Sequence, residues 1–108
     1  MGPAVHTHTS PVKLHDALDQ VEADALRQVF GSHVPPVTAN KSMIGHAMGA
    51  ASAIESIMAV EGMRTGMLPP TINYTPDTEI DLDSVVHTGR QVNQEYVLKN
   101  AFGFGGCN

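Results

Sequence analysis

Residues 41–62 read Lys-Ser-Met-Ile-Gly-His-Ala-Met-Gly-Ala-Ala-Ser-Ala-Ile-Glu-Ser-Ile-Met-Ala-Val-Glu-Gly, and this stretch decides the fold. A loop that carries a lysine leads to a histidine and then to a run of small and apolar residues without proline. Apolar residues recur in the run at intervals of three and four, which is typical of one face of a helix. The residues on that face are Ala47, Ala50, Ala51, Ile54 and Met58. The pattern predicts a buried helix that begins close to His46 and reaches a turn at Gly62.

Small residues at the start of this helix let another backbone approach closely, so tight packing accounts for Gly49 and the alanines beside it. His46 needs a different explanation. A histidine at a helix N-terminus lies at the positive end of the helix dipole, which disfavours the imidazolium form. A neutral imidazole can donate one hydrogen bond to a developing oxyanion. His46 is therefore a candidate catalytic residue.

Four segments carry a resemblance to one enzyme family. Lys41–Glu55 resembles a segment of the elongating β-ketoacyl-acyl carrier protein synthases, and it is also similar to polyketide ketosynthases. Three more segments resemble family motifs in the family's order, namely Asp19–Leu26, Pro69–Asn73 and Asn100–Gly106. The resemblance covers roughly residues 5 to 108, whereas the family's chains are several times longer. It implies that residues 1–108 form a partial, C-terminal ketosynthase domain that lacks the nucleophile-bearing N-terminal half.

The resemblance implies an α/β fold, the C-terminal half of the thiolase-like layered αβαβα architecture. In that half, a mixed sheet packs against the buried small-residue helix. The residue pattern itself predicts a further helix over residues 19–30, with Asp19 as its N-cap. Its expected apolar face consists of Val21, Ala25, Leu26 and Val29. Short strands are expected at residues 5–8, 37–38, 85–86 and 96–98, with a surface loop over residues 73–83.

The chemistry that the resemblance implies is decarboxylative Claisen condensation, in which an acyl thioester and a malonyl thioester join. Negative charge develops on two carbonyl oxygens, so fixed hydrogen-bond donors are needed at both places. By resemblance, His46 and a second histidine hold the malonyl carbonyl, and Lys41 belongs to the catalytic set. The backbone N–H of Phe104 contributes to the oxyanion hole, and its ring resembles the gate of the acyl pocket. The resemblance gives supporting roles to Glu55, Asp19, Gly103 and Gly105.

The second histidine has two possible positions. Val5-His6-Thr7-His8 resembles the family's "VNAH" segment and places His8 at the catalytic position. A second register places His6 there instead. Thr9 and Ser10 are similar to hydroxyl residues that contact the pantetheine of the substrate. We favour His8 and keep His6 as the alternative.

Composition excludes several other classes of protein. The net charge is −5 and the six Lys and Arg residues are scattered, which argues against a nucleic-acid module. No apolar run approaches the ~20 residues of a membrane span, and no signal peptide is recognisable, so the cytoplasm is the default location. The lone cysteine, Cys107, excludes an internal disulfide and is interpreted as a small loop residue.

The expected partners follow from the resemblance. They are an acyl carrier protein with phosphopantetheine-linked acyl and malonyl groups, the missing N-terminal half and a second subunit in a homodimer or heterodimer. No cofactor and no metal are expected, and the isolated chain is expected to be inactive because it lacks the catalytic cysteine. One alternative is a non-catalytic partner of the chain-length-factor type. This alternative is favoured by the missing glycine after the histidine and by the insertion at residues 12–18. A less favoured alternative is a metal-binding module that uses His6 and His8 with His15 or Asp16.

Overall fold

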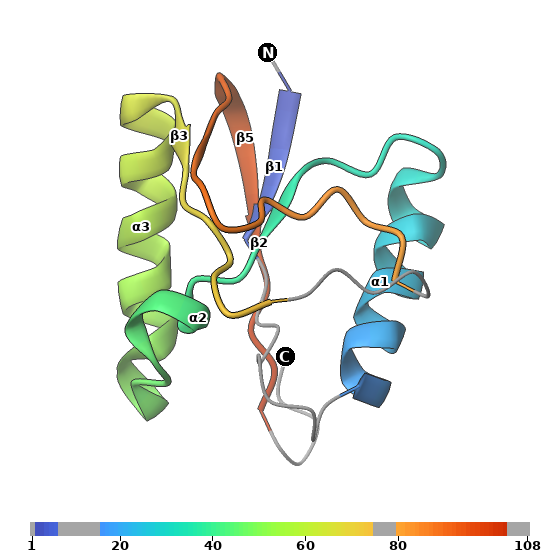
Figure 1. The fold of residues 1–108 in the computed structure, drawn as a ribbon, viewed down its shortest axis with the longest axis horizontal. Coiled ribbons are helices and arrows are strands. Elements are labelled where there is room, and N and C mark those ends of the chain that lie inside the picture. The colour runs from blue at the N-terminus through green and yellow to red at the C-terminus, as the bar shows by residue number, and fades with distance from the viewer. Residues whose placement is uncertain (1, 7–15, 75–79, 104–108) are drawn as a thin grey trace.

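The structure is a computed structural model that describes residues 2–6, 16–74 and 80–103. The chain is α/β, with helices and short strands alternating along the sequence (Figure 1). The elements in order are β1 (Gly2–His6), α1 (Asp16–Phe30), β2 (Val37–Thr38), α2 (Lys41–Ile44), η2 (Met48–Ala50), α3 (Ala51–Thr65), β3 (Met67–Leu68), β4 (Arg90–Gln91) and β5 (Gln94–Lys99). Of the predicted strands, 37–38 is confirmed as β2 and 96–98 lies within β5.

The central sheet has three parallel strands in the order β2-β1-β5. In the register of this sheet, His6 at the end of β1 lies opposite both Thr38 and Lys99. The carboxyl ends of all three strands therefore reach the same edge. A separate antiparallel pair joins β3 to β4. The single mixed sheet expected from the sequence is instead divided into a parallel and an antiparallel part. The predicted strand at 85–86 is wrong as a regular element, since Val86 makes only an isolated bridge to Thr71.

The central sheet lies between two long helices, with α3 on one side and α1 on the other (Figure 1). α3 packs against β5 and β3. Among the described residues, two small apolar clusters form the core. One contains Leu26 and Val37 with partly buried neighbours, and the other contains Leu68 and Val85 with Val92. None of the helices in the described part of the chain is long and apolar enough to cross a membrane.

The buried face of α3 differs from the face predicted by apolar spacing. Its buried residues are Ala51, Glu55, Ala59 and Gly62, while Ala50 and Ile54 of the predicted face are exposed. The prediction of a buried small-residue helix is therefore correct for one stripe and wrong for the rest. The stripe is selected by an ion pair at Glu55 and by close packing at Gly62, and hydrophobicity alone signals neither of these.

Gly62 lies inside α3, which continues to Thr65, so the predicted turn begins too early. A Cβ at Gly62 would lie 3.0 Å from the carbonyl oxygen of Met67. The Gln94 side-chain amide also donates a 3.1 Å hydrogen bond to the Gly62 carbonyl. Gly62 therefore marks a close approach of β3 and β5 to the helix, and the chain reverses at Gly66 in the left-handed region.

α1 begins at Asp16, so the prediction that Asp19 caps this helix is wrong. The predicted apolar face is correct at Leu26, which is buried, and wrong at Val21 and Val29, which are 65% and 74% exposed. The residues buried with Leu26 are Glu22 and Ala23. The sequence pattern marks all apolar positions of α1, whereas the described residues cover only one side of it.

Candidate functional site

The candidate site lies at the edge where the three parallel strands end. Sites in open α/β sheets form outside the carboxyl ends of the strands. Each strand here leads into a segment with predicted site residues: β1 into residues 7–15, β2 into residues 39–46 and β5 into residues 100–104. The predicted residues His8, Thr9, Ser10, Phe104 and Gly105 lie outside the described residues. His6 is described only by its backbone position at the end of β1.

The segment after β2 is held in place by side-chain hydrogen bonds to residues 69–72. The Thr38 hydroxyl donates to the Pro69 carbonyl at 2.6 Å, and the backbone N–H of Ala39 donates to the Thr71 hydroxyl at 2.9 Å. Ser42 receives a 2.9 Å hydrogen bond from the Ile72 N–H through its hydroxyl oxygen. Since Thr38, Ala39 and Thr71 are buried, these bonds fix the backbone on both sides of Lys41.

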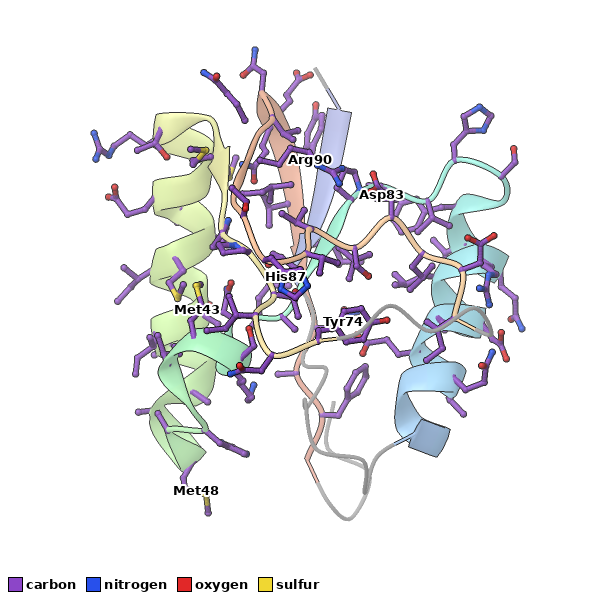
Figure 2. The ribbon with its side chains drawn as sticks, viewed as in Figure 1. Met43, Met48, Tyr74, Asp83, His87 and Arg90 are labelled. Carbon is purple, nitrogen blue, oxygen red and sulfur yellow. The ribbon has the colours of Figure 1, made fainter. Side chains whose placement is uncertain are left out.

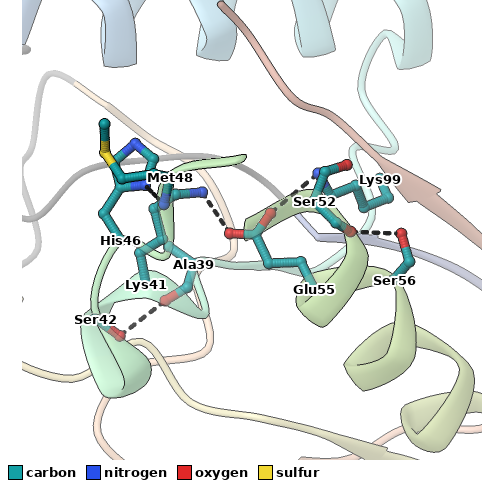
Figure 3. A network of polar contacts seen from close by, with 9 residues as sticks. All are labelled: Ala39, Lys41, Ser42, His46, Met48, Ser52, Glu55, Ser56 and Lys99. Carbon is teal, nitrogen blue, oxygen red and sulfur yellow. Dashed lines mark hydrogen bonds and ion pairs between the residues drawn. The ribbon is translucent and has the colours of Figure 1, made fainter. Parts of the chain in front are cut away.

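Glu55 of α3 lies at the centre of a buried ionic network, and two lysines contact it (Figure 3). The ammonium group of Lys41 donates to one carboxylate oxygen. The ammonium group of Lys99 lies 3.0 Å from the other oxygen and also donates to the Ser52 hydroxyl at 2.9 Å. The side chains of Lys41, Glu55 and Lys99 are 5%, 3% and 15% exposed. The structure therefore brings together Lys41 and Glu55, which the sequence singled out, and adds Lys99.

The two lysines control the ionisation of Glu55. Burial by itself raises the pKa of this carboxyl group. Hydrogen bonds from Lys41 and then Lys99, together with their positive charges, outweigh burial and hold the pKa of Glu55 below its ordinary value. Glu55 is therefore a fixed carboxylate at neutral pH, which suits it to hold the lysines rather than to transfer a proton.

His46 lies before the helix, between Gly45 and η2, and its side chain is exposed among the described residues. Gly45 has φ +76°, a left-handed conformation that favours glycine and turns the chain between α2 and His46. The Met48 backbone N–H donates a 3.0 Å hydrogen bond to His46 Nδ1 (Figure 3). An Nδ1 that accepts this bond carries no proton, so the neutral ring carries its proton on Nε2. In that tautomer Nε2 is the hydrogen-bond donor of the ring.

Met48 adopts φ +50°, which is unusual for a residue with a side chain. Met48 is 77% exposed, and its side chain projects away from the body of the molecule (Figure 2). The turn at residues 46–48 therefore has a strained backbone, and it brings the Met48 N–H within hydrogen-bond distance of His46 Nδ1. Because His46 precedes the helix, it and Glu55 need not share a helical face.

The segment after β5 is anchored to α1. The Asn100 amide donates a 3.4 Å hydrogen bond to the buried Glu22 carboxylate. Gly103 is exposed at the end of the described segment. Asp19 lies in the same helix as Glu22, but only its backbone is described. Lys99, Asn100 and Glu22 were not predicted as site residues, although Asn100 begins the Asn100–Gly106 segment and Glu22 lies in the Asp19–Leu26 segment. Lys99 had no sequence signal beyond its position next to Asn100.

The ion pair between Arg90 and Asp83 lies apart from this network. Arg90 donates two hydrogen bonds to Asp83, of 2.7 and 2.8 Å, and the two side chains lie side by side (Figure 2). Both are partly exposed. The hydrogen bonds from Arg90 hold the pKa of Asp83 below its ordinary value, against a smaller opposing effect of burial. No group of three or more potential metal ligands occurs among the described residues. His8 and His15 of the metal-site alternative lie outside them.

Comparisons with known proteins agree on one family. The sequence profile described as beta-ketoacyl synthase, C-terminal domain, matches residues 4–75. The chain is 43% identical over 95 residues to 3-oxoacyl-[acyl-carrier-protein] synthase 2 of Coxiella burnetii. That alignment includes 85% of this chain and 23% of the relative. The chain thus spans about a quarter of the length of the curated relatives it matches.

Solved structures give the same result. The ishigamide ketosynthase/chain length factor matches with a TM-score of 0.85 and 34% identity, over 94% of this chain and 25% of that one. A type II polyketide synthase acyl-carrier protein in complex with its ketosynthase bound to the hexaketide matches with a TM-score of 0.84 and 35% identity. That match covers 95% of this chain and 25% of the solved chain.

Proposed function

Because the chain belongs to the family of β-ketoacyl synthase C-terminal domains, we propose that it forms the C-terminal part of a condensing enzyme. The complete enzyme joins an acyl group, held as a cysteine thioester, to a malonyl group on acyl carrier protein in fatty acid or polyketide synthesis. Residues 1–108 supply the enolate-stabilising side of the site. The nucleophilic cysteine comes from the N-terminal half.

One observation carries this proposal: the three segments with predicted site residues leave the sheet at the same edge. His6, Thr38 and Lys99 are aligned across the sheet, and the chain continues from them toward His8, His46 and Phe104. These segments lie far apart in the sequence. A condensation site needs donors from separate segments around one pair of thioesters, and this topology supports such a convergence.

The chemistry divides between two sets of donors. When malonyl thioester loses carbon dioxide, the electron pair of the broken C–C bond moves into an enolate, whose oxygen gains negative charge. The Nε2–H of His46, with a donor from His8 or alternatively His6, would stabilise this oxygen. The enolate carbon then attacks the acyl thioester, and the cysteine thiolate leaves. The Phe104 N–H would stabilise the second oxyanion, and its ring would close the acyl pocket.

The remaining predicted residues support these donors. Glu55 would hold Lys41, and through it the segment that ends at His46, since Lys41 donates to the buried carboxylate. Gly103 and Gly105 would give the Phe104 loop its backbone freedom. Thr9 and Ser10 would contact pantetheine, and Asp19 would support the segment that precedes α1.

The rest of the fold is proposed to complete a layered αβαβα architecture. Large apolar side chains remain exposed on α3, which supports a covering layer from the N-terminal half. They are Ile54, Ile57, Val60 and Met63. We also propose an acyl carrier protein partner, which is supported by the solved complex of a similar ketosynthase with its carrier protein, and a dimer of like or related subunits.

Condensation by the complete protein tests the proposal. Acyl- and malonyl-acyl carrier protein are supplied together, and 3-oxoacyl product and carbon dioxide are measured by mass spectrometry and isotope release. His46→Ala is expected to lower kcat by roughly 10²–10³, the cost of one oxyanion donor. His33→Ala, at an exposed histidine outside the site, serves as the matched control. Equal activity of the two variants would refute the role of His46, and an inactive wild-type protein would refute the enzyme.

A second candidate is the non-catalytic partner subunit. It is favoured by the similarity to a structure that contains a ketosynthase and a chain length factor. The residue at the nucleophile position of the N-terminal half decides between the candidates. A cysteine there supports the enzyme, and any residue without a thiol supports the partner.

A further inference from the structure

We propose that Lys99 is a positioning residue of the condensation site, which fixes the end of the central sheet and the glycine-rich segment after it against α3. This inference rests on the proposed function. Lys99 does not belong to the four segments that carry the family resemblance, which resume at Asn100. Its position is nevertheless the point where β5 ends and the predicted oxyanion-hole loop begins.

Two contacts with α3 fix the position of the Lys99 ammonium group against that helix. Its ammonium group lies 3.0 Å from Glu55 Oε2 and donates to the Ser52 hydroxyl at 2.9 Å. Ser52 and Glu55 are three residues apart and share a helical face. Two contacts one turn apart fix both the distance of the strand from the helix and its position along the helix. The side chain is 15% exposed, so water competes little for the ammonium group.

Neutralising the carboxylate does not account for Lys99, because Lys41 already contacts Glu55. Bringing a second lysine into a buried site costs desolvation free energy, which is offset only by paired contacts. The two lysines enter from different segments. Lys41 begins the helix that leads to His46, and Lys99 ends the strand that leads to Phe104. Glu55 thus joins the two predicted donor segments to one carboxylate.

The register of the sheet extends this effect to the third segment. Lys99 lies opposite His6 in β1, the last described residue before the segment with His8. A displacement of Lys99 would therefore move the ends of two neighbouring strands together. Because misplacing reacting groups by about 1 Å can cost roughly 10²-fold in rate, Lys99 should act on kcat rather than on substrate binding.

The test uses the complete synthase with acyl- and malonyl-acyl carrier protein as substrates. Lys99→Ala and Lys99→Met should lower kcat by roughly 10- to 100-fold, with KM changed by less than about threefold. Propylammonium, which replaces the missing stem and ammonium group, should restore kcat of Lys99→Ala by about tenfold or more. It should not restore Lys99→Met, whose side chain fills the space. Tetramethylammonium has no N–H donor and should restore neither variant.

Arg64→Ala is the matched control, since it removes an exposed ion pair with Glu61 from α3, the helix that Lys99 contacts. Equal kcat for Lys99→Ala, Lys99→Met and Arg64→Ala would overturn the proposal, and so would a loss in Lys99→Ala that propylammonium leaves unchanged. If Lys99→Ala does not fold, the kcat and KM of Lys99→Met decide alone, with a loss confined to kcat as the supporting result.

A second readout separates this proposal from the proposed function. Propylammonium should raise the Tm of Lys99→Ala and leave that of the wild-type protein unchanged. An inactive wild-type protein whose Lys99→Ala variant is stabilised in this way refutes the condensing function and leaves the ionic contact in place. An active wild-type protein with a Lys99→Ala variant of normal kcat refutes the role of Lys99 only.

Discussion

The two faces of α3 are held in different ways. The inner face buries small residues and the charged Glu55, whereas the outer face exposes large apolar side chains such as Ile57 and Val60. An amphipathic helix in a self-contained domain has the opposite arrangement. The comparison shows that ionic contacts and close backbone packing within the described residues hold the inner face of α3 in place. The exposed apolar face is suited to contact with another surface, and we propose that the N-terminal half provides it.

Removal of the central carboxylate should have the largest effect on stability. Glu55→Ala leaves Lys41 and Lys99 buried side by side without a counter-charge, which should cost about 3–5 kcal/mol of unfolding free energy. Urea denaturation of the complete protein measures this cost. A loss below about 1 kcal/mol, as for exposed pairs, would show that the inner face is not held by this network.

The outer face provides the next largest effect if it is covered as proposed. Ile57→Ser in the complete protein should then lower the unfolding free energy by about 2–5 kcal/mol, as for a buried large apolar residue. If Ile57 stays as exposed as it is among these residues, at 65%, the change should remain within about 0.5 kcal/mol. Glu61→Ser, at an exposed polar position of the same helix, is the control. Equal denaturation midpoints of the two variants would contradict the proposal that the outer face of α3 is covered.

Close packing on the inner face should give a smaller loss. The added Cβ of Gly62→Ala would lie 3.0 Å from the Met67 carbonyl oxygen, and relieving that contact should cost about 1–3 kcal/mol. Gly49→Ala is a matched control, because a Cβ at Gly49 meets nothing within 4 Å. Thermal unfolding should therefore separate the two glycine variants. A Gly62→Ala protein as stable as Gly49→Ala would show that the helix and β3 move apart easily.

The smallest expected effect is the difference in acid stability between variants of the inner face and variants of the outer face of α3. The pKa of Glu55 is lowered in the folded state, so its contribution to stability is complete above the unfolded pKa of about 4.3 and is lost as pH falls through the folded value. Between about pH 5 and pH 2, the wild-type protein should therefore lose more stability than Glu55→Gln. Glu61→Gln should leave the acid slope nearly unchanged, since the Glu61–Arg64 pair is exposed. A slope that responds to Glu61 instead would contradict this assignment.

Local signals explain which features could be predicted from the sequence. Both residues of Val37–Thr38 are β-branched, and the pair follows two prolines, so β2 was predictable. Resemblance singled out Lys41 and Glu55, and the structure places them in contact. The faces of α1 and α3 were not predictable, because burial depends on which partner surface each helix meets. Lys99 was missed because Ser52 lies 47 residues away in sequence, and no spacing rule connects a strand end to a helix at that distance.

The most direct test of the site geometry is the tautomer of His46, read from ¹⁵N chemical shifts in the complete protein labelled at histidine. The hydrogen bond from the Met48 N–H to Nδ1 predicts that the neutral ring is protonated on Nε2. In that tautomer Nε2–H is the ring's donor, the group proposed to bind the thioester oxygen. A neutral ring protonated on Nδ1, or a mixture of both tautomers, would contradict the proposed role of His46 as the fixed donor to the enolate.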